Sequence, residues 1–200
     1  MAGPHYAISE AFIVLAALWC AARLGSSGQW WGALGSAIFG MAAAIGVYRF
    51  GAGQIAELAS LHKNFSQIGG SIAMALMSTQ LLLEAPRVHR AAAGKWILVA
   101  AVLASAVTAF AVPALTTPLF ISWLAIAIIA AAMIPAKSIA RRVARAAIVA
   151  VFLINLLWIR QSPLLGPDLS WHLFHILVAL WLVGMDHVLA CRHSDQDPAG

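Results

Sequence analysis

Histidine and carboxylate side chains lie within or beside long apolar stretches of this sequence, where ionisable groups are costly. His172 and His175 stand three positions apart at the start of the last apolar stretch, so in a helix both imidazoles project from one face. Two imidazoles at that spacing can share a metal ion, and zinc is the usual candidate. His62 and Glu10 lie near the same ends of two earlier stretches. We therefore expect a site in which His62, His172 and His175 hold the metal, with Glu10 beside them.

A zinc ion held by three histidines leaves one position for water and suits one class of chemistry. Such an ion activates its bound water and polarises a carbonyl group, so the expected reaction is hydrolysis of an amide or ester. Glu10 would serve as a further ligand or as the base. Asp168, four residues before His172, would cap the last helix or orient the His172 ring. A plainer interpretation is also open, in which the histidines beside Trp171 form an interfacial belt and Glu10 is a buried, hydrogen-bonded carboxyl group.

The composition shows which elements must position these residues. Of the 200 residues 62% are hydrophobic and 10% are charged, and the mean hydropathy is +0.90. Soluble, disordered and disulfide-rich classes are excluded by these values. Charges, prolines and glycines divide the chain into apolar stretches long enough to span a bilayer. We expect an all-α bundle of seven transmembrane helices at residues 6–24, 29–50, 64–85, 94–112, 118–135, 139–160 and 169–190.

The chain is therefore expected to form a single transmembrane domain over residues 1–190, followed by a short polar cytoplasmic tail at 191–200. It would be a multi-pass protein of an inner or plasma membrane. The chain has 12 Lys and Arg residues and 7 Asp and Glu residues. The basic residues form no stripe with interleaved aromatics, so nucleic acid is not an expected partner. The lipid bilayer is the expected partner, together with a lipid substrate or apolar ligand, and a protein partner is possible.

The positions of the basic residues predict the orientation. If odd-numbered helices run inward, nine basic residues lie inside: Arg23, Arg87, Arg90, Lys95, Lys137, Arg141, Arg142, Arg145 and Arg192. Three lie outside: Arg49, Lys63 and Arg160. This asymmetry places the amino terminus outside and the carboxyl terminus in the cytoplasm. Of the outer three, Arg49 is expected to extend to the lipid headgroups, or to pair with Glu10 or a lipid phosphate.

The start of the last helix, Trp171-His172-Leu173-Phe174-His175-Ile176-Leu177, resembles that of the CREST superfamily, which includes alkaline ceramidases, the progestin and adipoQ receptors and the hemolysin III relatives. That family carries His-x-x-x-His at this position. It also has Ser-x-x-x-His at the end of the second helix and an Asp early in the third, with zinc on the three histidines. The resemblance implies a seven-helix fold and a zinc-dependent hydrolase of lipid amides or esters.

Several positions depart from the family pattern. Aligning the last helix on its leucine-rich part places His175 as the second histidine and Trp171 at the first position. Arg49 stands where the second helix of the family has its histidine. On the resemblance, His62 substitutes for that histidine, and Ser66 or Gln67 replaces the aspartate, which makes Ser66 a candidate catalytic residue with Glu10.

Other functions are compatible with the same residues. The chain could be a non-enzymatic accessory subunit, or a receptor-like bundle that binds a lipid or another small ligand. Haem held by His62 and His175 is a third alternative. Transport is less favoured because no inverted repeat is recognisable.

Overall fold

The computed structural model describes residues 3–85 and 92–196, and this part of the chain consists of helices and their connecting segments, without strands. The α-helices are α1 (Tyr6–Ser26), α2 (Trp30–Gly51), α3 (Ala59–Asn64), α4 (Gly70–Glu84), α6 (Ala92–Ala111), α7 (Thr116–Met133), α8 (Ile139–Ile154) and α9 (Pro167–Gln196). The structure also contains two π-helical segments, η1 (Phe65–Gly69) and η3 (Asn155–Ile159), and one 3₁₀ turn, η2 (Pro113–Leu115).

The all-α fold expected from the sequence is confirmed. Because η1 joins α3 to α4 and η3 extends α8 without a break, the described residues form seven helical rods close to the expected ranges. Two expected inner cations, Arg87 and Arg90, lie outside the described residues. The last helix runs on to Gln196, so the expected tail begins as a continuation of α9.

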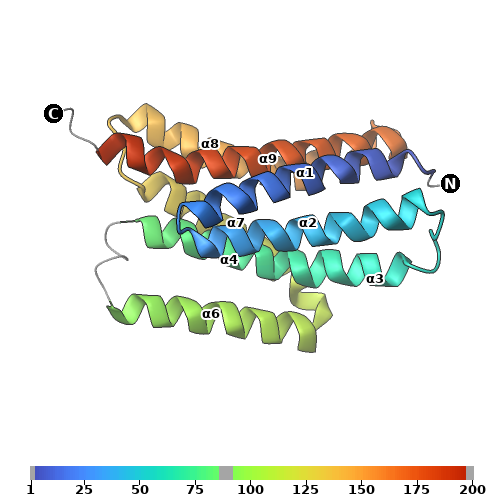
Figure 1. The fold of residues 1–200 in the computed structure, drawn as a ribbon, viewed down its shortest axis with the longest axis horizontal. Coiled ribbons are helices and arrows are strands. Elements are labelled where there is room, and N and C mark those ends of the chain that lie inside the picture. The colour runs from blue at the N-terminus through green and yellow to red at the C-terminus, as the bar shows by residue number, and fades with distance from the viewer. Residues whose placement is uncertain (1–2, 86–91, 197–200) are drawn as a thin grey trace.

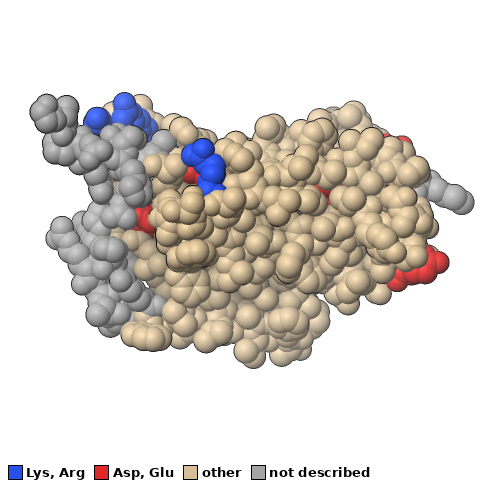
Figure 2. All heavy atoms as spheres, viewed as in Figure 1, with Lys and Arg blue, Asp and Glu red and all other residues tan. Residues whose placement is uncertain are grey.

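Five of the rods have the length and composition of membrane helices. Five of the described helices are long and apolar enough to cross a bilayer: Tyr6–Ser26, Trp30–Gly51, Pro113–Met133, Ile139–Ile159 and Pro167–Ala190. Large apolar side chains point outward along them, including Leu15, Ile129 and Leu180, each at least 60% exposed. On the face in Figure 2 the charged atoms gather towards the two ends, and the band between them is almost wholly uncharged. Such a band is unfavourable in water and suits lipid.

Six of the rods close into a ring. Helix α1 packs against α2 and α9, α2 against α4, α4 against α7, α7 against α8, and α8 against α9. Helix α6 lies outside this ring, chiefly against α4 (Figure 1). The beginning of α1 and the loop from α2 to α3 lie at one end of the bundle, and the described end of α9 lies at the opposite end (Figure 1). The ring therefore brings α1 and α9, the first and last helices of the chain, side by side.

Small and polar residues fix the helices around the ring. At Gly35 of α2 an added Cβ would lie 2.8 Å from the Ala73 carbonyl oxygen, so only glycine permits this approach of α4. The hydroxyl of Ser71 donates to the carbonyl of Thr116, and that of Ser78 to the carbonyl of Trp123, both at 2.8 Å. Close backbone approach and interhelical hydrogen bonds of this kind hold helices together in lipid.

Candidate functional site

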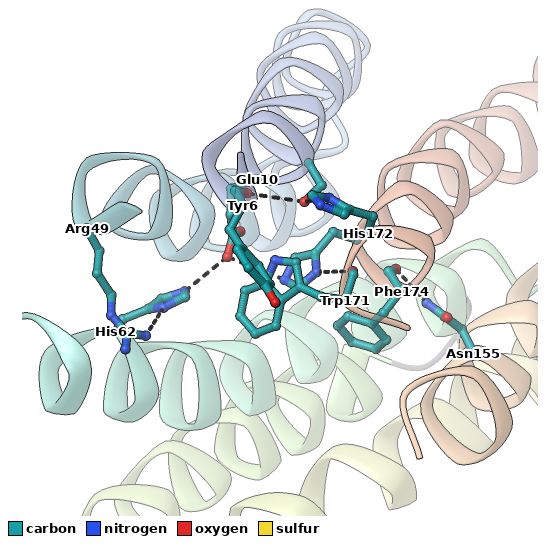
Figure 3. Close-up of polar contacts among 10 residues, drawn as sticks. Tyr6, Glu10, Arg49, His62, Asn155, Trp171, His172 and Phe174 are labelled. Atoms are coloured by element: carbon teal, nitrogen blue, oxygen red, sulfur yellow. Dashed lines mark hydrogen bonds and ion pairs between the residues drawn. The ribbon is translucent and has the colours of Figure 1, made fainter. Parts of the chain in front are cut away.

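The Glu10 carboxyl group lies at the centre of the polar cluster near the α2–α3 end of the bundle. Glu10 is only 2% exposed. Its Oε1 atom lies 3.4 Å from Nε2 of His62 and 3.4 Å from Nε2 of His175. Both histidines are themselves buried. Helices α1, α3 and α9 thus bring one carboxyl group and two imidazoles to the same point (Figure 3).

A glycine of the second helix makes room for this carboxyl group. A Cβ placed on Gly46 would lie 2.5 Å from Glu10 Oε1 and 3.0 Å from Glu10 Cγ. Real Cβ atoms do not approach other atoms so closely. The Glu10 side chain therefore lies against the bare backbone of α2, and its place in the cluster depends on the absence of a side chain at Gly46.

The second nitrogen of each ring determines what the ring presents to Glu10. Nδ1 of His175 lies 2.7 Å from the Trp171 carbonyl oxygen. That oxygen can only accept, so Nδ1 carries the proton and the neutral ring presents a lone pair at Nε2. Nδ1 of His62 lies 3.3 Å from Nη1 of Arg49, which can only donate, so the neutral His62 ring carries its proton on Nε2. His62 can thus donate towards Glu10, whereas His175 can take up a proton beside it.

Arg49 holds His62 in this state. Its Nε donates to the Ile55 carbonyl at 2.9 Å, which fixes the guanidinium group beside the ring. With Nδ1 accepting from Arg49, the neutral His62 ring keeps its Nε2 proton directed towards Glu10.

The structure places His172 apart from the other two histidines. Its Nδ1 lies 3.1 Å from the Ser9 hydroxyl, and its ring stacks against Tyr6 with centroids 5.4 Å apart. The Tyr6 hydroxyl in turn donates to the Asp168 carboxylate. The rotation between positions three residues apart is enough to direct His175 to Glu10 and His172 to Ser9. Asp168 thus joins α9 to α1 through Tyr6.

These positions differ from the arrangement that a zinc site needs. Among the residues that the structure describes, no group of three or more His, Cys, Asp or Glu side chains is placed to hold a metal ion. His62 also has the positive charge of Arg49 against its ring. In the described arrangement His172 therefore lies against Ser9 and away from the two rings beside Glu10. Zinc ligation by His62, His172 and His175 stays a prediction.

A cavity of about 750 Å³ opens beside the cluster. Glu10, His62 and His175 all line it. Its apolar wall is built from residues of five helices: Ile13, Phe39, Phe120, Phe152, Phe174 and Val178. Ser66 and Gln67 also line the cavity. Ser66, expected as a catalytic residue, is exposed, and its role stays a prediction. The volume lies in the range of cavities that hold small molecules.

Both π-helical segments contribute to this cavity. Ser66 and Gln67 belong to η1, and Leu156 belongs to η3. A π-helical turn inserts extra backbone into a helix and rotates the following side chains, and it occurs often at functional sites. The Asn155 amide donates to the Phe174 carbonyl at 2.8 Å, which joins η3 to α9 where the cavity is lined.

Several residues of the site could not be predicted from the sequence. Trp171 acts through its carbonyl oxygen and through its ring, which stacks on His175 at 4.3 Å, and a backbone acceptor leaves no signature in the residue type. Gly46 stands in a small-residue stretch that is equally suited to simple packing. Lys63 and Arg160 also line the cavity. The only indication of this in the sequence was that both are expected on the outer side.

No family model, no curated protein and no solved structure matches this chain.

We predict that Gly46→Ala lowers the free energy of unfolding by about 1–3 kcal/mol, because the new methyl group overpacks the Glu10 carboxyl group. Unfolding in a denaturing detergent titration measures this change. In the Glu10→Ala background the same substitution should lower the free energy of unfolding much less, because the carboxyl group that the new methyl group would contact is absent. Gly51→Ala on the same helix is the matched control, because its nearest neighbour would be Ala7 Cβ at 3.9 Å. Equal costs of Gly46→Ala in both backgrounds would contradict the proposed contact.

Proposed function

We propose that this protein is a seven-span integral membrane protein with its amino terminus on the outer side. The support is the apolar surface of the rods, the five helices of sufficient length, and the excess of Lys and Arg at the ends assigned to the cytoplasm. In this orientation the Glu10 cluster and its cavity lie near the outer surface of the membrane.

Cysteine labelling tests the orientation. In a chain whose Cys20 and Cys191 are replaced by serine, Gln54→Cys should react with a membrane-impermeant maleimide on intact cells. Lys137→Cys should react only after the cells are opened. Both positions are exposed, so accessibility within the fold does not limit either reaction. The reverse pattern would overturn the assigned orientation.

We further propose that the protein binds a lipid or another amphiphile in this cavity. The observation that carries the proposal is that one cavity combines an aromatic and aliphatic wall with a polar end, where Glu10, His62 and His175 converge. An apolar chain would lie against Phe39, Phe152 and Phe174, and the polar part of the molecule would face the cluster. Ligand sites commonly combine a mostly apolar lining with a few placed polar groups.

Filling the cavity tests this function. Ala43 is 3% exposed and lines the cavity, so Ala43→Phe should occupy the space of an apolar chain. We expect the amount of lipid that co-purifies with the protein, measured by mass spectrometry of extracts, to fall by at least half. Ala104→Phe on the exposed surface of α6 is the control and should retain its lipid. Equal lipid content in the wild type and both variants would count against the cavity as the binding site.

Hydrolysis of the bound lipid is the second candidate function, favoured by the buried Glu10–His175 pair in the cavity wall. A water molecule would attack the ester or amide carbonyl carbon while its proton passes to Nε2 of His175. The adjacent Glu10 would stabilise the resulting imidazolium. The proton would then pass to the departing alkoxide or amine, giving a carboxylic acid and an alcohol or amine.

Release of fatty acid from lipid esters and amides by the purified protein measures this activity. We expect Glu10→Gln and His175→Ala each to reduce the rate by about 10²-fold or more, the scale of a general acid–base contribution. His172→Ala should retain the rate, since His172 faces Ser9. Loss of the rate in His172→Ala as well would instead favour the three-histidine metal site.

A further inference from the structure

Basic residues are distributed unevenly around the cavity. Arg49, Lys63 and Arg160 are the three basic residues that the charge pattern assigns to the outer side, and all three line the cavity. They come from α2, from α3 and from the residue that follows η3. Cations at outer membrane ends run against the usual charge bias. The positive-inside bias therefore does not explain why all three cations line the same cavity.

The positions of these side chains are suited to a bound anion. The Cζ atom of Arg160 lies 4.9 Å from the centre of the Phe174 ring, so its guanidinium group is held over the aromatic wall of the cavity. Arg49 uses its Nε and Nη1 atoms for Ile55 and His62, and a guanidinium group has five N–H donors. Lys63 is exposed at the opening and can follow a ligand with its flexible side chain.

The formal charge of the cavity lining is positive. Among the described lining residues, the three cations face a single carboxyl group, that of Glu10. Glu10 lies 2% exposed between His62 and His175, whereas Lys63 and Arg160 are exposed at the opening. The polar end of a ligand at the opening therefore meets positive charge, while its apolar chain meets phenylalanine rings.

Resting on the lipid-binding function proposed above, we propose that the ligand is an amphiphile with a phosphate headgroup, which Arg49, Lys63 and Arg160 bind at the opening of the cavity. Phosphate is favoured over carboxylate because two guanidinium groups and one ammonium group supply more donors than a single carboxylate can accept. Guanidinium groups also match phosphate oxygens in bidentate hydrogen bonds.

Competition binding tests this specificity. The purified protein in an uncharged maltoside detergent is loaded with a fluorescent lipid, which is displaced by compounds of one chain length: hexadecyl phosphate, hexadecanoate, hexadecanol and hexadecyltrimethylammonium. We expect hexadecyl phosphate to bind at least about tenfold more tightly than hexadecanol, on the scale of hydrogen bonds to charged groups. Its affinity should fall as the salt concentration rises.

Two double variants with the same loss of charge give the matched comparison. Lys63→Gln/Arg160→Gln should weaken hexadecyl phosphate by about tenfold and leave hexadecanol unchanged, since only charge-assisted contacts are lost. Lys137→Gln/Arg142→Gln removes two exposed cations at the other end of the bundle and should leave both affinities unchanged. Arg49 is left intact because it also positions His62.

The possible outcomes separate this inference from the lipid-binding function. Similar affinities for the phosphate, the alcohol and the ammonium compound would overturn the headgroup assignment and leave lipid binding in place. Hexadecanoate that binds as tightly as hexadecyl phosphate would overturn the choice of phosphate over carboxylate. Failure of the fluorescent lipid and of every competitor to bind the wild-type protein would overturn both proposals.

Discussion

The burial of one carboxyl group in an apolar bundle is the constraint on which the rest of this structure depends. An ionisable group at membrane depth is expensive unless it has partners. Glu10 finds its partners in two imidazoles at 3.4 Å, one from α3 and one from α9. Removing either partner would leave a buried polar group without compensation, which costs more than the pair contributes. The cluster therefore links three helices and determines which end of the ring is polar.

The surrounding fold is arranged to permit this burial. Gly46 leaves space on α2 for the carboxyl group, and the Trp171 carbonyl fixes the tautomer of His175. The two π-helical segments place additional polar and apolar side chains on the cavity beside the cluster. Because the helices are tied by interhelical hydrogen bonds such as Ser71 to Thr116, the cavity is a property of the packed ring rather than of a mobile loop.

The helical rods could be predicted from the sequence because hydropathy and breaker residues act locally, and the seven expected ranges lie close to the rods. The polar residues could be chosen for a similar reason, since Glu10 and His175 stand within apolar stretches and His62 stands beside the end of one. Which of these polar residues contact one another could not be predicted from the sequence. Whether His172 or His175 faces Glu10 depends on a rotation within α9 and on the packing of α1 against it. The role of Arg49 beside His62 depends on the path of the chain between α2 and α3, which the residue types in that stretch do not determine.

An experimental density map of the protein in its native lipid would show whether the cavity beside Glu10 holds an amphiphile. We expect elongated density inside the ring, running from the Phe39 and Phe152 rings towards Glu10 and ending near Arg160. A map in which the phenylalanine rings close over this space, or in which Glu10 faces away from His62 and His175, would contradict lipid binding at this site.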